Sequence, residues 1–323
     1  MLLLTREDIY SLITMKEAIE AMGEAFAALT LGRARMPMRQ SMDVGGGATL
    51  LCMPSKIATL PSSVVKLVTV VPDNARRGRP TVQAIVAYFN DETGEPMALL
   101  EGSSLTALRT GAAGGLAARY LARRDSEVVA VFGAGVQGRS QLEALAAVLP
   151  ITDAYVVNPT PSKAERFAKE MSEKLGIRVV PSEARRAVEQ ADVIVTATTS
   201  NLPVFESRWV KAGTHINAVG SFRPDSREVE GNLVARAKVV VDSLEAAKAE
   251  AGDIIMAVAE GLMRWDDVYG ELGEIVLGIK PGRQGVGEIT LFKSVGLAVQ
   301  DAAIAHLAYT KAVREGVGRH IAL

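Results

Sequence analysis

The chain has 323 residues, of which 48% are hydrophobic, and this length and composition are sufficient for two domains with separate cores. Its 36 Lys and Arg residues nearly balance its 37 Asp and Glu residues, which leaves a formal net charge of −1 at pH 7. Because there is no basic surplus, no nucleic acid and no membrane partner is expected, and a small-molecule partner is favoured.

The scarcity of cysteine and histidine argues against a disulfide framework or a metal centre. Cys52 is the single cysteine, and the three histidines are too scattered to give a ligand spacing. The N-terminus becomes charged at Arg6, and no apolar run is long enough to cross a membrane, so neither a signal peptide nor a membrane span is predicted. We therefore expect a cytoplasmic protein without a bound metal.

The first elements along the chain are predicted to be helices, and a sheet follows them. Thr5 and Thr14 each precede an acidic residue by three positions, the pattern of a capping box, and a one-sided apolar pattern then continues to Gly32. Short alternating or β-branched runs come next, separated by glycine-containing turns. They predict strands at Met36–Val44, Ala48–Met53, Val64–Val71, Val82–Asn90 and Met97–Glu101. Consecutive strands with short turns favour an antiparallel sheet.

Two further helices are assigned to the same part of the protein. One is rich in small residues, is capped by Ser103 or Ser104, and ends near Leu121. The other is the last helix, Ser294–Arg314, which is amphipathic enough to dock back on the N-terminal sheet. We therefore predict an α+β domain, antiparallel in its sheet, that comprises residues 1–122 with 296–323.

A glycine turn between two apolar strands organises the rest of the chain. The strand Glu127–Phe132 leads directly into Gly133-Ala-Gly135-Val-Gln-Gly138, a helical pattern follows to Leu149, and the next strand ends at Asn158. In a βαβ unit, the first glycine of this motif permits the tight turn, the second lets the backbone approach a pyrophosphate, and the third allows helix and strand to pack closely. The context therefore predicts dinucleotide binding, although a similar glycine turn also occurs in α/β proteins that bind nothing.

Strands and helices then alternate to the end of this domain. Strands are predicted at Ile177–Val180, Val193–Thr199, His215–Val219 and Lys238–Ser243, and helices at Ser162–Leu175, Ser182–Gln190 and Leu244–Glu250. This alternation predicts a Rossmann-type, doubly wound parallel sheet over residues 123–295. The fold class is therefore α/β for this domain, next to the α+β domain with its antiparallel sheet.

The residue at the end of the second strand bears on the choice of cofactor. An acidic residue there would bind the adenosine ribose 2′-OH and repel a 2′-phosphate, whereas Asn158 does neither. Thr160, Ser162, Lys163 and Arg166 follow and supply hydroxyls and cations that could hold a phosphate. NADP is therefore slightly favoured over NAD. The alternative is that these residues only cap and solvate the next helix, because Ser162 to Glu165 also has capping-box spacing.

Three basic residues interrupt apolar segments and are candidates for chemistry. Lys66 lies in the strand Val64–Val71, Arg39 lies in the run before it, and Arg109 lies in the small-residue helix. Guanidinium groups bind carboxylates bidentately, and a partly buried lysine readily shifts its pKa and can donate a proton. The alternative for the two strand residues is a solvated sheet face.

Several motifs in order along the chain resemble the ornithine cyclodeaminase and μ-crystallin family. They are Pro37-Met-Arg39, Val64-Val-Lys66, Arg79-Pro-Thr-Val-Gln83, Leu105-Thr-Ala-Leu-Arg-Thr-Gly-Ala112, Gly133-Ala-Gly-Val-Gln-Gly138, Asn217-Ala-Val-Gly-Ser-Phe-Arg-Pro-Asp225 and Phe292-Lys-Ser-Val-Gly296. The resemblance covers nearly the full length. It implies a homodimer formed through the N-terminal sheet, and an imino or amino acid as substrate.

The resemblance also implies roles for individual residues. Arg39 and Arg109 would hold the substrate carboxylate, Lys66 would act as acid or base near the Cα nitrogen or carbonyl, and Thr81 and Ser294 would lie by the nicotinamide. The full set predicted to bind the cofactor is Thr81, Arg109, Gly133, Gly135, Val136, Gln137, Gly138, Asn158, Thr160, Ser162, Lys163, Ala197, Thr198, Val219 and Ser294.

Two departures from the family pattern narrow the predicted reaction. The aspartate that cyclodeaminases and archaeal alanine dehydrogenases carry after the fifth strand is replaced here by Phe222, which cannot take a proton. The glutamate that holds the distal ammonium of ornithine is also missing, since Leu50, Leu51 and Met53 are apolar. Asp225 is retained as a candidate acid or base, although pairing with a neighbouring arginine or a capping role is an equal alternative.

These features predict an NAD(P)H-dependent reductase of cyclic imino acids, Δ1-pyrroline-2-carboxylate or Δ1-piperideine-2-carboxylate, which would yield proline or pipecolate. The alternatives are an alanine dehydrogenase, an ornithine cyclodeaminase, and a non-catalytic, NADPH-dependent ligand-binding protein like μ-crystallin.

Overall fold

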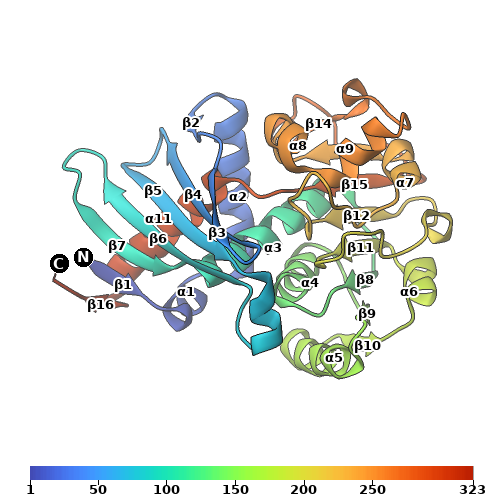
Figure 1. The fold of residues 1–323 in the computed structure, drawn as a ribbon, viewed down its shortest axis with the longest axis horizontal. Helices are drawn as coiled ribbons and strands as arrows, with labels where there is room; N and C mark the ends of the chain where they lie inside the picture. Colours follow the sequence, from blue (N-terminus) through green and yellow to red (C-terminus); the bar gives the residue numbers. More distant parts are fainter. Residues whose placement is uncertain (323) are drawn as a thin grey trace. The chain divides into compact units, whose positions relative to one another are not determined.

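The computed structural model describes residues 1–322, except for the side chains of Ala75 and Arg76, and divides the chain into two compact units (Figure 1). The first unit is Met1–Arg109 together with the C-terminal segment that begins at Leu297, and the second is Thr110–Gly296. The first division therefore falls within a helix, α3 (Gly102–Leu121), and not after it as we expected.

The first unit contains a mixed sheet in the order β16-β1-β7-β6-β5-β4-β2, with β3 paired to β4. Its strands are β1 (Leu2–Leu4), β2 (Ala34–Arg35), β3 (Gln40–Gly45), β4 (Ala48–Ile57), β5 (Ser62–Val70), β6 (Val82–Asn90), β7 (Pro96–Glu101) and β16 (Arg319–His320). The strands predicted between Met36 and Glu101 pair antiparallel, from β3 to β7, as expected. The sheet is mixed because β1, which was not predicted, runs parallel to β7. Strands as short as β1 and β16 are too short to display a two-residue period, so the sequence pattern did not reveal them.

Helices α1 (Arg6–Leu12), α2 (Met15–Thr30) and α11 (Ala298–Glu315) complete the first unit, with the short 3₁₀ helix η1 (Pro72–Arg77). Both predicted capping boxes are present: Thr5 pairs with Asp8, and Thr14 pairs with Glu17. The predicted start of the last helix at Ser294 was wrong. The backbone N–H groups of Val295 and Gly296 donate to the carboxylate of Asp242, and the helix begins only at Ala298. The predicted docking of this helix on the sheet is confirmed by its contacts with β4, β5 and β6.

The cap of α3 also differs from the expectation. Neither Ser103 nor Ser104 caps the helix with its hydroxyl; instead, the carboxylate of Glu101 accepts hydrogen bonds from the backbone N–H groups of Ser103 and Ser104 at 2.9 and 2.8 Å. A carboxylate at this end also interacts favourably with the helix dipole. Glu101 therefore has a structural role that the serine-rich start of the helix obscured.

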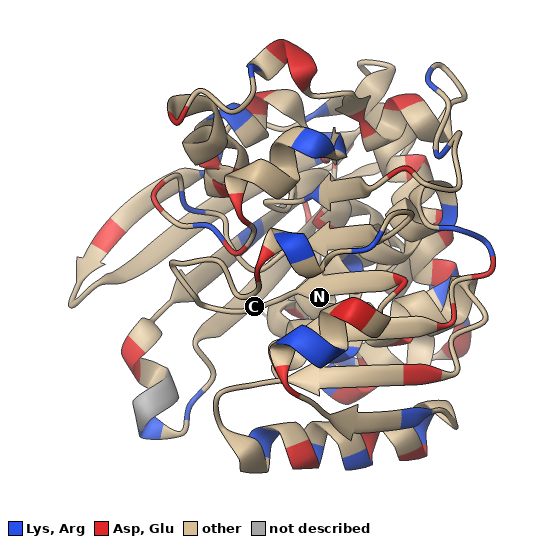
Figure 2. Cartoon of the chain, turned by 90° about the vertical axis from the view of Figure 1, so that its right-hand side faces the viewer, with Lys and Arg blue, Asp and Glu red and all other residues tan. Residues whose placement is uncertain are grey.

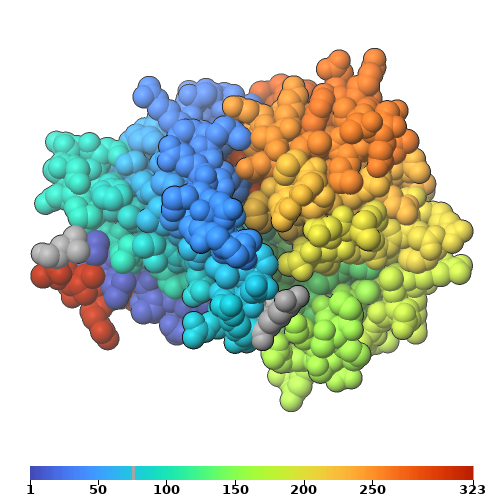
Figure 3. All heavy atoms as spheres, in the orientation of Figure 1, coloured from blue at the N-terminus to red at the C-terminus, as the bar shows by residue number. Residues whose placement is uncertain are grey.

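The two faces of the first sheet differ in burial. On the face toward α11, Val64, Lys66 and Val68 of β5 are all buried. The opposite face carries exposed apolar side chains, which include Met42 and Ile85. β3, blue in Figure 3, lies at the surface in that view. Alternation along β5 therefore places Lys66 inside, and the solvated-face alternative for this residue is wrong.

The second unit is a doubly wound parallel sheet in the order β10-β9-β8-β11-β12-β15-β13-β14. Its strands are β8 (Val128–Phe132), β9 (Asp153–Val157), β10 (Arg178–Pro181), β11 (Val193–Thr196), β12 (His215–Ala218), β13 (Lys238–Val241), β14 (Gly270–Glu271) and β15 (Thr290–Lys293). The chain passes from β8 to β9 and β10 on one side and then returns to β11 on the other. The predicted Rossmann-type topology is confirmed.

Helices connect these strands, as the alternating pattern predicted. They are α4 (Val136–Val148), α5 (Pro161–Leu175), α6 (Ala184–Gln190), α7 (Gly231–Arg236), α8 (Leu244–Glu250), α9 (Gly252–Ala259) and α10 (Leu272–Val276), with 3₁₀ helices η2 (Ser207–Trp209) and η3 (Trp265–Asp267). The capping box expected at Ser162 is wrong, since α5 starts one residue earlier with Thr160 as its N-cap. Helices α7, α9 and α10 were not predicted.

Charged residues of both signs are interspersed along the ribbon in Figure 2, and this fits the near-neutral composition. Among the described residues, no helix combines the length and the apolar composition that crossing a bilayer requires.

Candidate active site

The glycine turn after β8 has the geometry of a phosphate cradle. Gly133 has a φ of +105°, and a Cβ there would lie 2.4 Å from the carbonyl oxygen of Ala197. A Cβ on Gly138 would lie 2.2 Å from the carbonyl oxygen of Gly133, whereas Gly135, the N-cap of α4, is exposed and has no such neighbour within 4 Å. The turn therefore needs glycine at two positions and leaves open space at the third, in front of a helix N-terminus, where a pyrophosphate would fit.

Val136 and Gln137, which follow in the first turn of α4, were also predicted to meet the cofactor. Val136 is 62% exposed, and the side-chain oxygen of Gln137 is buried without a hydrogen-bond partner among the described residues. A buried unpaired acceptor is costly, so this oxygen has hydrogen-bonding capacity left for a ligand.

Asn158 directly follows β9 and connects the glycine turn after β8 to the segment that leads into α5. Its side-chain oxygen accepts from the N–H of Ala134 at 3.5 Å, and its amide nitrogen donates to the carbonyl of Thr160 at 3.2 Å. Ser162 and Lys163 lie exposed in the first turn of α5. The position that would meet the ribose 2′ group is thus neutral, and an exposed cation, Lys163, follows it in the chain.

The segments after β11, β12 and β15 hold the remaining predicted cofactor residues of the second unit. The N–H of Ala197 donates to the carbonyl of Phe132, and the N–H of Val219 donates to the carbonyl of Thr196. Thr198 donates to a buried carboxylate, and the hydroxyl of Ser294 donates to Asp242 at 2.8 Å. These residues lie at or just after the carboxyl ends of parallel strands, the edge where doubly wound sheets bind dinucleotides.

In the first unit, Lys66 forms a buried ion pair that the sequence did not reveal. Its Nζ lies 2.6 Å from Oδ2 of Asp301, and the exposed fractions of these side chains are 2% and 0%. Burial lowers the pKa of Lys66 from 10.5 to about 8; the charge of Asp301 opposes this decrease, and the positive charges of Arg109 and Arg39 add to it. A lysine with this pKa exchanges a proton near neutral pH.

Arg109 joins the same cluster through two residues of α11. Its Nε lies 3.2 Å from Oδ1 of Asp301, and its Nη1 donates to the side-chain oxygen of Gln300 at 2.7 Å. The oxygen of Gln300 also accepts from the N–H of Leu297, which fixes its orientation. Asp301 therefore bridges Lys66 and Arg109 and holds the guanidinium in place.

Asp301 and Gln300 were not predicted as site residues. A signal was present, because both are polar residues within the apolar pattern of the last helix and both are fully buried. The other predicted residues of the first unit are less enclosed: Arg39 lies between β2 and β3, and Thr81 lies between η1 and β6 with its carbonyl accepting from Val71.

Asp225 is an exposed residue that pairs with a neighbouring arginine. Its carboxylate is exposed and receives two hydrogen bonds from Arg223, at 2.9 and 2.7 Å, and this pairing lowers its pKa. A solvated, paired carboxylate with a lowered pKa is a weak general acid or base near neutral pH. The arginine-pairing alternative therefore describes Asp225, and we do not retain it as a catalytic group.

His215 is fully buried between Thr290 and Asn217, and burial lowers its pKa to about 3, so it is neutral. The described residues contain no group of three or more potential metal ligands.

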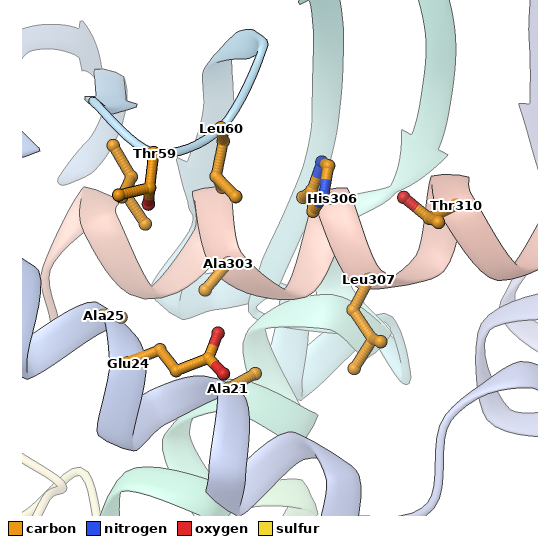
Figure 4. A pocket seen from close by; sticks show the side chains of 10 residues that line it. Ala21, Glu24, Ala25, Thr59, Leu60, Ala303, His306, Leu307 and Thr310 are labelled. Atoms are coloured by element: carbon orange, nitrogen blue, oxygen red, sulfur yellow. The ribbon is translucent and has the colours of Figure 1, made fainter.

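A cavity of about 190 Å³ in the first unit is separate from these residues. It is lined by α2, the turn after β4, and α11, with Glu24, Thr59, His306 and Thr310 as its polar members (Figure 4). None of Lys66, Arg109 or Asp301 lines it.

Comparisons with known proteins agree with this geometry. Residues 1–316 match the ornithine cyclodeaminase/μ-crystallin family. A Δ1-pyrroline-2-carboxylate reductase of Bacillus cereus is 43% identical over 99% of both chains, and an alanine dehydrogenase of Archaeoglobus fulgidus is 40% identical over 99% of this chain and 98% of its own. The structure of the Thermococcus litoralis Δ1-pyrroline-2-carboxylate reductase in complex with NADH and L-proline has a TM-score of 0.97 and 46% identity, and covers 99% of this chain and 100% of its own. The chain therefore belongs to the ornithine cyclodeaminase/μ-crystallin family.

Proposed function

We propose that this protein is an NAD(P)H-dependent reductase that converts cyclic imino acids, Δ1-pyrroline-2-carboxylate or Δ1-piperideine-2-carboxylate, into proline or pipecolate. The observation that carries the proposal is the buried cluster of Lys66, Arg109 and Asp301 in the first unit. The glycine turn and the parallel sheet of the second unit supply a dinucleotide site that fits the required cofactor.

The reaction requires one hydride, one proton and no carboxylate base. The nicotinamide cofactor, when bound, would supply the hydride with its two electrons to the imine carbon. The C=N bond becomes a single bond, and the nitrogen holds the proton that makes the imine electrophilic. Lys66, with a pKa of about 8, can supply or maintain that proton.

The carboxylate of the substrate would be fixed by guanidinium groups. Arg109 is 7% exposed and is oriented by Asp301 and Gln300, so its planar donor array is preorganised before a ligand arrives. Arg39 adds a second positive charge to the surroundings of Lys66. Three cations, Lys66, Arg109 and Arg39, act around one buried carboxylate, so the cluster carries net positive charge, which favours an anionic ligand.

The same residues distinguish the alternatives. Phe222 occupies the position where cyclodeaminases and archaeal alanine dehydrogenases carry an aspartate, and Asp225 is held in an exposed pair. Leu51 and Met53 of β4 are buried and apolar, so they offer no partner to the distal ammonium of ornithine. Alanine dehydrogenase is the second candidate, because the relative from Archaeoglobus fulgidus is 40% identical.

The test follows the absorbance of NADPH and NADH in separate reactions with the cyclic imine, with pyruvate plus ammonia, and with ornithine alone. Consumption with the imine only supports the proposal. Consumption with pyruvate plus ammonia would identify an alanine dehydrogenase, ammonia release from ornithine would identify a cyclodeaminase, and cofactor binding without any turnover would identify a crystallin-like binder.

We further propose that the cofactor site accepts both dinucleotides with a preference for NADPH. The support is the neutral Asn158 and the neighbouring Lys163, which leave no acidic group to repel a 2′-phosphate. Similar structures were solved with NADH and with NAD, so both KM values need to be compared. A lower KM for NADH than for NADPH would reverse the preference.

The exposed apolar face of the first sheet supports a homodimer. Met42, Leu67 and Ile85 are 55%, 39% and 46% exposed and lie on the face opposite α11. Exposed apolar surface of this kind marks interaction sites. Light scattering should report a dimer for the wild type and a monomer for Ile85→Glu; equal masses would contradict the assignment of this face.

A further inference from the structure

A buried glutamate, Glu228, joins the loops that follow β11 and β12 in the second unit. Its carboxylate accepts from the N–H of Thr198 at 2.6 Å, from the hydroxyl of Thr198 at 2.7 Å, and from the N–H of Gly220 at 2.8 Å. The residue is 0% exposed. One side chain therefore sets the spacing between two loops that adjacent strands deliver to the same edge of the sheet.

Gly220 is fitted to this carboxylate. A Cβ at position 220 would lie 2.4 Å from both carboxylate oxygens of Glu228, closer than non-bonded atoms approach. The carboxylate therefore occupies the space in which any other residue would place its side chain. The glycine and the glutamate form a matched pair, and a change in either one displaces the other.

Glu228 is itself anchored by a second buried carboxylate. The N–H groups of Glu228 and Val229 donate to Oδ1 of Asp253 at 2.7 and 2.9 Å, and Oδ2 of Asp253 lies 2.7 Å from Nζ of Lys293. Lys293, at the end of β15, also donates to the carbonyl of Ser221 at 2.7 Å. The network thus reaches the loops after three neighbouring strands.

Burying two carboxylates and one ammonium costs desolvation free energy, so this cluster is not an efficient means of stabilising a sheet. Burial raises the pKa of Glu228, and the charge of Lys293 opposes that change. Buried ionic groups often add no net stability compared with well-packed apolar residues. The presence of these charged groups at the carboxyl edge of the sheet is therefore better explained by a functional requirement on the position of the loops.

The position of the loops in the sheet indicates which part of a dinucleotide they would contact. β8 and β9 present the glycine turn and Asn158 on one side of the point where the strand order reverses, and β11 and β12 lie on the other side. In doubly wound sheets, each half binds one mononucleotide of the dinucleotide. The adenosine half would lie by β8 and β9, so the nicotinamide half would lie by the loops that Glu228 holds.

We propose that Glu228 is a positioning residue that fixes the Thr198 and Gly220 loops against the nicotinamide half of the cofactor. This inference rests on the proposed use of a nicotinamide dinucleotide, and it adds a residue that does not itself touch the cofactor.

The test measures binding of two ligands that differ in the nicotinamide, without any turnover. NADH contains both halves of the dinucleotide, whereas ADP-ribose lacks the nicotinamide. Dissociation constants for both are determined by calorimetry for the wild type, Glu228→Gln and Gly220→Ala. The matched control is Glu230→Gln, because Glu230 lies two residues away and accepts from the N–H of Ser207 outside these loops.

In Glu228→Gln, an amide N–H₂ would face one of the loop donors, and an unsatisfied buried group costs enough to weaken binding roughly tenfold. We expect that loss for NADH in Glu228→Gln and Gly220→Ala, with ADP-ribose binding changed less than about twofold, since the adenosine half is held elsewhere. Glu230→Gln should bind both ligands like the wild type.

Unchanged NADH binding in both variants would overturn the proposal, and so would an equal loss of both ligands, which would show a general structural role. Retained ADP-ribose binding in either variant shows that the second unit is folded. These outcomes are independent of the proposed reaction, which fails if the wild type binds NADH but does not reduce the imine.

Discussion

Replacing Lys66 with methionine should remove a pH-dependent part of the free energy of unfolding. Lys66 is fully buried and its pKa in the folded protein is about 8, against 10.5 for the exposed group. Between these values the unfolded chain binds more protons than the folded one, so stability rises with pH. The pKa of Lys66 differs between the two states by about 2.5, which corresponds to at most roughly 3 kcal/mol of unfolding free energy at 1.36 kcal/mol per pKa unit. About 2 kcal/mol of this change in unfolding free energy occurs between pH 7 and pH 9.5.

The assay is urea unfolding at pH 7 and at pH 9.5 for the wild type and for Lys66→Met. The stability of the wild type, relative to Lys66→Met, should increase by about 2 kcal/mol between the two pH values. Lys16→Met is the matched control, because the same substitution is then made at an exposed lysine on α2. Parallel pH dependence in the wild type and Lys66→Met would refute the reasoning, because Lys66 would then have the same pKa in both states.

Three predictions concern the reaction. Lys66→Ala should lower kcat by about a hundredfold or more, as the loss of a general acid does, with an unchanged dissociation constant for NADPH by fluorescence titration; equal activity would exclude its role. Arg109→Ala should raise the KM for the imine roughly tenfold or more, since a bond between charged groups is lost, with a smaller effect on kcat; an unchanged KM would count against carboxylate binding. Asp301→Asn removes the charge that raises the pKa of Lys66, so the fall of kcat/KM at high pH should begin at a lower pH, and a profile that coincides with the wild type would contradict this pairing.

Local patterns correctly predicted much of the architecture. The two capping boxes at Thr5 and Thr14, the strand Val82–Asn90 and the glycine turn at Gly133 each depend on residues close together in sequence, and each is present. The family, the Rossmann-type unit and the class of reaction agree with the comparisons.

The errors arose where distant groups compete with a local signal. A serine was expected to cap α3, but the carboxylate of Glu101 accepts the hydrogen bonds of the first N–H groups of the helix. The last helix was expected to begin at Ser294, but Asp242 binds the hydroxyl of Ser294 and the following backbone, and the helix begins only at Ala298. Such interactions depend on packing between segments, which periodicity does not encode.

The sequence by itself determined the longer elements of this protein and the basic residues that its chemistry requires, because propensities, caps and glycine turns act over a few residues. Only the tertiary structure decided that Asp301, from the last helix, neutralises Lys66 and orients Arg109. The physical reason is that a buried charge needs a partner in space, and docking α11 on the sheet brings the two ends of the first unit together.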